Sequence, residues 1–177
     1  MAGAGVAAIY LSQVRVSLVV VVLMIGAYFV PQTGVSERLG QGIDDVRTYY
    51  TGGGAFTNVG VRLELWKGAG MLVARHPWAP SSNAQVKEEL RELVDAGKLQ
   101  PFVLEAEHFH NDALQVLVFG GVIGFLCWFG TLLMPFLFFL RILQSHETAS
   151  PRLIAPALAG LLLVVSYFSF GLTEVIF

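Results

Sequence analysis

Four polar residues suited to proton transfer and hydrogen bonding lie together in the sequence: His108, His110, Asn111 and Asp112. They directly precede a long apolar stretch, and we expect a helix to begin at Asn111 or Asp112 because both residue types cap helix starts. Unpaired N–H groups and the helix dipole there favour an anion such as phosphate. Histidine changes protonation near neutral pH, so His110 beside that anion would suit a general base. The alternative is that His110 only anchors the helix end.

A metal site is the second alternative for this segment. Its ligand-type side chains alternate closely enough to share one side of an extended strand: Glu105, Glu107, His108, His110 and Asp112. The sequence holds no distal third cluster and no zinc-type signature. We therefore expect no metal.

Two arginines could take part in the same chemistry. Arg62 precedes Trp66 by one helical turn, and an arginine fork can bind phosphate oxygens in pairs. The alternative for Arg62 is a solvated or headgroup-binding side chain. Arg15 is either a functional charge within the membrane or an anchor at its edge.

The composition indicates the class of protein that must position these residues. Hydrophobic residues make up 55% of the 177 residues and charged residues only 14%, against about 25% charged in soluble domains. Since a membrane span needs about 20 apolar residues, we predict spans at about 9–30, 112–140 and 153–175 and a polar loop at about 31–110. The fold class is an all-α membrane protein with polytopic transmembrane helices. A net charge of −2 does not suggest a nucleic-acid partner.

The short link between the last two spans indicates the orientation. It carries Arg141, His146 and Arg152 against Glu147, and positive charge in short loops marks the cytoplasmic side. The long loop would then be periplasmic in a Gram-negative host. Because the sequence stops while still apolar, we expect a longer polytopic protein with further helices.

Amphipathic helices are expected within the periplasmic loop, at 61–75 and 84–96. Ser82 and Gln85 match a capping box for the second helix, and Gly97 is suited to end it. Both helices would lie on the membrane surface or pack over the spans. In the following span we expect Pro135 to kink the helix and the pair Gly120 and Gly124 to allow close packing of another helix.

The motifs together resemble the O-antigen ligase family, over about residues 15–177, the C-terminal half of such a protein. The run of residues 107–115 is similar to a His-x-His-Asn-x-x-Leu-Gln pattern, and Gly121 and Gly124 follow at the family's spacing. Arg62 and Trp66, with His76 and Pro77 closing their helix, resemble the family's Arg-x-x-x-Trp helix. Pro77 is followed by Trp78 and Ala79 where the family often has a Gly-x-Gly turn, and the family's Ser-Arg pair is matched only loosely by Ser12 and Arg15.

The resemblance implies a membrane glycosyltransferase of the bacterial inner membrane, multi-pass, with its active site facing the periplasm. Its donor would be a glycan on undecaprenyl diphosphate and its acceptor a hydroxyl of lipid A-core or another glycan, with inversion and without cofactor or metal. His110 and Arg62 would be catalytic, and Asn111, His108 and Arg15 would bind substrate. An O-antigen polymerase or protein O-oligosaccharyltransferase would use the same donor. A transporter or non-catalytic membrane protein is the alternative from another class.

Overall fold

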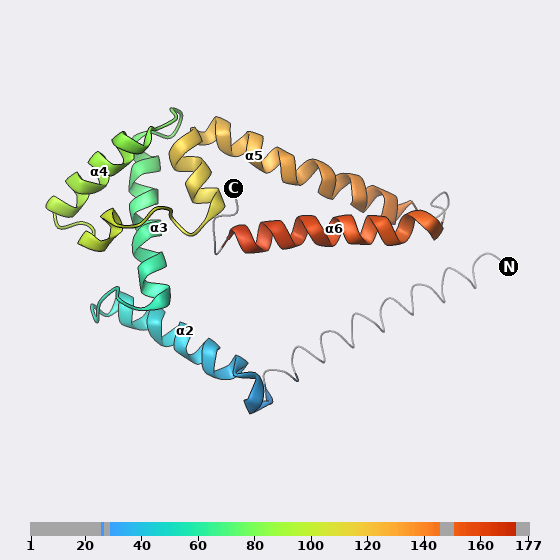
Figure 1. Ribbon diagram of the computed structural model, residues 1–177, viewed down its shortest axis with the longest axis horizontal. Helices are drawn as coiled ribbons and strands as arrows, with labels where there is room; N and C mark the ends of the chain where they lie inside the picture. The colour runs from blue at the N-terminus through green and yellow to red at the C-terminus, as the bar shows by residue number, and fades with distance from the viewer. Residues whose placement is uncertain (1–25, 27–28, 146–150, 173–177) are drawn as a thin grey trace. The chain divides into compact units, whose positions relative to one another are not determined.

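The computed structural model describes residue 26, residues 29–145 and residues 151–172; Arg15 and nearly all of the span predicted at 9–30 lie outside this part. The described residues form helices and no strand, which confirms the all-α prediction. The elements, in chain order, are η1 (Pro31–Thr33), α2 (Val35–Tyr50), α3 (Asn58–Arg75), α4 (Asn83–Asp95), η2 (Pro101–Leu104), α5 (Asp112–Gln144) and α6 (Pro151–Gly171) (Figure 1).

The chain divides into two compact units, Met1–Val59 and Gly60–Phe177. In the first unit, α2 follows Gly34, whose φ of 65° places it in the left-handed region that glycine tolerates. The helix ends where the Thr51 N–H donates to the Arg47 carbonyl. Our sequence analysis did not predict α2, and none of its residues is buried.

In the second unit, α3 and α4 agree with the two predicted loop helices. Leu65, Ala69 and Leu72 of α3 are buried in one core with apolar residues of α4 and of the segment that follows it: Val86, Leu90, Leu93, Leu99 and Val103. Gly68 allows this close approach, since a Cβ there would lie 3.2 Å from Leu99 and 3.3 Å from Leu90. The same core includes Phe109 and Val118, so α3 and α4 pack over the start of α5.

Both ends of α4 are closed as its sequence predicts. The Ser82 hydroxyl accepts from the Gln85 N–H at 3.3 Å, and the Gln85 side chain accepts from the Ser82 N–H at 2.9 Å, which completes the capping box. At the other end Gly97 has a φ of 66°. Its N–H donates to Val94 and the Lys98 N–H donates to Leu93, the pattern of a Schellman motif.

The helices α5 and α6 are each long and apolar enough to cross a membrane. In their most apolar windows only 11% is buried, whereas the core helix of a soluble protein is mostly buried. The two helices run side by side (Figure 1), with the ring of Phe139 lying against Gly160. Their bounds agree with two of the three predicted spans.

A break in α5 lies at Gly121, where φ is 62° and ψ is −168°. This region of backbone space is essentially restricted to glycine. In Figure 1 the first turns of α5, in yellow, run at a steep angle to the rest of the helix. We had expected the change of direction at Pro135, but that residue lies within the helix and the non-helical angles belong to Gly121.

The expected role of Gly120 and Gly124 also differs. A Cβ at either position would meet only Val116 of the same helix within 4 Å, so no other described helix approaches the pair closely. The close approach occurs instead at Gly121, where a Cβ would lie 2.9 Å from the backbone carbonyl of Trp78. Gly121 therefore allows the loop that contains Trp78 to approach the break in α5. The signature glycines do not pack against a second described helix.

Candidate active site

The segment that connects η2 to α5 carries His108 and His110, and it is held in place at Phe109. The Phe109 side chain is buried in the core shared by α3, α4 and α5. Its carbonyl accepts a hydrogen bond from the indole Nε1 of Trp66 at 3.0 Å, and its N–H donates to Oε1 of Gln115 at 3.1 Å. Two helices thus hold both polar groups of the residue that precedes His110.

Asn111 fixes the other side of His110. It is the N-cap of α5, as predicted, and its Oδ1 accepts from the Leu114 N–H at 3.0 Å. Its Nδ2 donates to the carbonyl of Leu172, just after α6, at 3.0 Å. One amide side chain therefore caps α5 and ties its start to the end of α6.

His110 lies between these two anchored residues with a φ of 50°, the one positive φ of a non-glycine residue in the described chain. Left-handed backbone is uncommon for such residues and costs on the order of 1–3 kcal/mol, so the neighbouring contacts must impose it. The rings of His108 and His110 meet edge to face, with centroids 4.2 Å apart and planes at 84°. The structure therefore brings the two predicted histidines together on a backbone that is fixed on both sides.

Arg62 lies on α3, half-buried, one turn before Trp66. Residues four apart in a helix share a face, so Arg62 belongs to the side of α3 from which Trp66 reaches the carbonyl of Phe109. This hydrogen bond joins elements that are 43 residues apart in sequence. It joins the helix that carries Arg62 to the segment that carries His110, the two residues predicted to be catalytic.

A buried carboxylate that the sequence analysis missed holds α3 to the segment before η2. Glu64 is 3% exposed, and its Oε1 accepts from the Gln100 N–H at 3.0 Å. The same oxygen lies 3.5 Å from Nζ of Lys67. A buried carboxylate is stabilised when it is paired and hydrogen-bonded. The sequence signal was an acidic residue between apolar neighbours on a helix face.

The start of α5 carries a second buried carboxylate, Asp112, which is 1% exposed. It packs against α6 so closely that a Cβ on Gly171 would lie 2.7 Å from Oδ2 of Asp112. A carboxylate in the first turn interacts favourably with the positive end of the helix dipole. The start of α5, where the sequence predicts an anion site, therefore already carries an acidic side chain of the protein.

The break in α5 is filled by the loop that follows α3. The Pro77 carbonyl accepts from the Val122 N–H at 2.8 Å, and the Ser81 N–H donates to the Phe119 carbonyl at 3.3 Å. Backbone groups freed by the break are satisfied by this loop, as buried backbone groups require. Pro77 and Ser81, on either side of Trp78, Ala79 and Pro80, thus hold α5 before and after its break.

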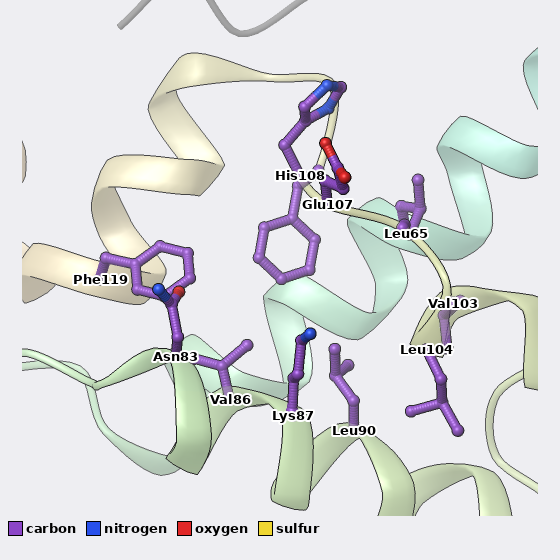
Figure 2. A pocket seen from close by; sticks show the side chains of 12 residues that line it. Leu65, Asn83, Val86, Lys87, Leu90, Val103, Leu104, Glu107, His108 and Phe119 are labelled. Carbon is purple, nitrogen blue, oxygen red and sulfur yellow. The ribbon is translucent and has the colours of Figure 1, made fainter.

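His108 lines a small cavity between α4 and the histidine segment. Figure 2 shows Lys87 of α4 between Val86 and Leu90, pointing upward toward the segment that carries His108. Phe119 of α5 lies at the left of this view. The cavity volume is about 40 Å³, enough for a few water molecules at about 10–15 Å³ each. Glu107, His108 and Phe109 line this cavity together with apolar side chains of α3, α4 and α5.

Among the described residues, no group of three or more His, Cys, Asp or Glu side chains is arranged to hold a metal ion. The acidic residues that alternate with the histidines, Glu105 and Glu107, are exposed. Arg15, the third predicted substrate-binding residue, lies outside the described part of the chain.

Comparison with known proteins identifies the relatives of this arrangement. The family model described as O-antigen ligase matches residues 1–129, which include Arg62, Trp66 and the run from His108 to Gly124. An uncharacterized protein of Haemophilus influenzae is 21% identical over 137 residues, which cover 77% of this chain and 34% of the relative. The chain thus spans about a third of the length of the curated relative it matches.

Proposed function

The chain belongs to the O-antigen ligase family, and from this premise we propose that it is part of a membrane glycosyltransferase that acts on undecaprenyl diphosphate. The enzyme moves the glycan from this lipid to a sugar hydroxyl of lipid A-core at the periplasmic face of the inner membrane. The observation that carries the proposal is His110, held in a left-handed conformation between two anchored residues at the mouth of an apolar helix. Because the chain covers about a third of its relative, we propose this activity for the protein as a whole.

The proposed reaction is a displacement at the anomeric carbon of the donor sugar. The oxygen of the acceptor hydroxyl attacks the anomeric carbon while His110 takes the hydroxyl proton. The new glycosidic bond forms as the bond between the anomeric carbon and the diphosphate oxygen breaks. The electron pair leaves with undecaprenyl diphosphate. A base fixed in position favours this step, because misplacement of a reacting group by about 1 Å can cost about 100-fold in rate.

Arg62 is proposed to stabilise the leaving diphosphate. The guanidinium fork matches phosphate oxygens in pairs, and its charge opposes the charge that develops on the leaving group. The buried carboxylate of Asp112 at the start of α5 makes this cation more important than the helix dipole. Arg15 is proposed as a further contact to the same lipid.

Asn111 and His108, which the resemblance assigns to substrate binding, are proposed to shape the substrate site by positioning His110 from either side in the sequence. The side chain of Asn111 is engaged by Leu114 and Leu172, so its part is to hold the loop that meets the substrate. His108, with its ring against that of His110, keeps the base oriented and lines the cavity beside α4.

The experiment that tests the function is deletion of the full-length gene in its host, with lipopolysaccharide resolved on a gel. A ligase predicts bare core without O-antigen. Core that carries one repeat unit would identify a polymerase instead, and unchanged lipopolysaccharide with loss of glycan from a protein would identify protein O-glycosylation. Unchanged glycans of every kind would favour a transporter or a non-catalytic membrane protein.

A further inference from the structure

The helix α2 carries an apolar stripe that no described residue of its own unit buries. Leu39, Ile43, Val46 and Tyr50 are spaced by three or four residues and are 53%, 68%, 38% and 75% exposed. At about 100° per residue these four side chains share an arc of about 60° on one side of the helix. A stripe of this regularity is the mark of a helix that lies against an apolar phase.

The charged residues of α2 lie outside this stripe, and the nearest of them is an arginine. On the helical wheel, Arg47 lies about 70° from the centre of the stripe and Arg38 about 110° from it. The acidic residues lie farther round, about 130–150° from the centre: Glu37, Asp44 and Asp45. Arginine side chains can lay their stems along an apolar surface and place their charged ends at phosphate level. A cation beside the stripe and acids on the far side of the helix suit a phospholipid surface.

The position of α2 in the chain favours the same occupant. The apolar sequence predicted to span the membrane ends at Val30, and α2 begins at Val35. The four residues between them reach at most roughly 14 Å, so α2 must begin near the membrane boundary. At its other end, Tyr49 and Tyr50 form an edge-to-face pair with centroids 5.3 Å apart, and tyrosines are enriched at membrane–water interfaces.

We propose that α2 is an interfacial helix that lies along the surface of the phospholipid bilayer, with Leu39, Ile43, Val46 and Tyr50 buried in the lipid. Its composition suits this position rather than a span, because charged residues cover its other face. The helix would hold the first part of the polar loop against the membrane. The proposal is independent of the transferase activity, since it rests on α2 alone.

The test is site-directed spin labelling of the full-length protein in vesicles of phosphatidylethanolamine and phosphatidylglycerol. Cys127 and any other native cysteine are first replaced by serine. Labels are then placed by Leu39→Cys, Ile43→Cys and Val46→Cys on the stripe, with Gln41→Cys, Asp44→Cys and Thr48→Cys as matched controls. Power saturation compares access of oxygen, which partitions into lipid, with access of a water-soluble nickel chelate.

We expect stripe labels to be accessible to oxygen and shielded from nickel, and control labels to show the reverse, so that the ratio oscillates with the helical period. Nickel access at all six sites would overturn the proposal in favour of a solvated helix. Stripe sites closed to both reagents would overturn it in favour of a protein partner, such as further helices of the longer chain or a second copy. Six independent labels keep the pattern readable if one variant misfolds.

Discussion

The indole Nε1 of Trp66 donates to the carbonyl of Phe109 at 3.0 Å, and this bond ties α3 to the residue that precedes His110. Trp66 was recognised in sequence only as part of a motif with Arg62. The structure gives it a physical part, because it sets the position of the peptide from which the proposed base extends. The bond therefore joins the helix that carries Arg62 to the segment that carries His110.

Replacing Trp66 tests this connection. Trp66→Phe keeps an aromatic ring but removes the donor, so we expect the stability of the protein to fall by about 1 kcal/mol. We expect glycan transfer to fall by roughly 10- to 100-fold, because the loop can shift. Quantified lipopolysaccharide capping and thermal unfolding in detergent measure the two effects. Trp78→Phe, at an exposed tryptophan, is the matched control; equal activity of both variants would contradict the positioning role.

Gly121 and Gly124 separate the two interpretations of the signature glycines. Gly121→Ala adds a Cβ 2.9 Å from the Trp78 carbonyl at a φ of 62°, and we expect a loss of at least about 1–3 kcal/mol. Gly124→Ala meets only Val116, at 3.8 Å or more, and should be neutral or stabilise the helix. Melting temperatures of the purified variants decide this. A larger loss at Gly124 would indicate that helix packing, and not the break, explains the spacing.

Asn111 has two tasks that two substitutions can separate. Asn111→Asp keeps the oxygen that caps α5 but replaces the donor to the Leu172 carbonyl with an acceptor. We expect it to lose the tie to α6 while it keeps the cap, whereas Asn111→Ala loses both and about 1 kcal/mol more. Limited proteolysis near Leu172 reports the tie directly. Wild-type protection of this site in Asn111→Asp would show that the bond is not important in solution.

Arg62→Lys preserves the charge and removes the paired donors. We expect transfer to fall by about tenfold or more, with normal amounts of protein, because a lysine cannot grip two phosphate oxygens in one plane. The control is Arg75→Lys at the end of the same helix, where Arg75 pairs with Glu89 and Glu92. Normal transfer by Arg62→Lys would exclude a bidentate contact to the diphosphate.

Local sequence patterns predicted the elements that depend on local chemistry. The periodicity of α3, the capping box of α4 and the start of α5 at Asn111 are confirmed because each is decided within a few residues. The contacts of Trp66 with Phe109 and of Asn111 with Leu172 join residues 43 and 61 positions apart. The spacing of residues along one helix does not predict such long-range contacts, because they depend on how the helices pack.

Two features were missed for different reasons. The signal for α2 was present in the spacing of Leu39 and Ile43, but Gly40 and Gly42 lower helix propensity and hid it. The break at Gly121 could not be read from its sequence, because a glycine within an apolar run fits a packed helix equally well. The loop that enters the break, through the Pro77 carbonyl, lies more than 40 residues away.

His110 is proposed as the base of the glycan transfer, and the sharpest test of this role is His110→Asn in the full-length gene. Asparagine tolerates the left-handed backbone that His110 adopts, so the loop is preserved while the base is lost. His76→Asn, at an exposed histidine that pairs with Glu89, is the control. We predict that His110→Asn reduces O-antigen capping by roughly 100-fold or more, with normal protein levels and normal capping in the control. Wild-type capping by His110→Asn would show that His110 is not the base.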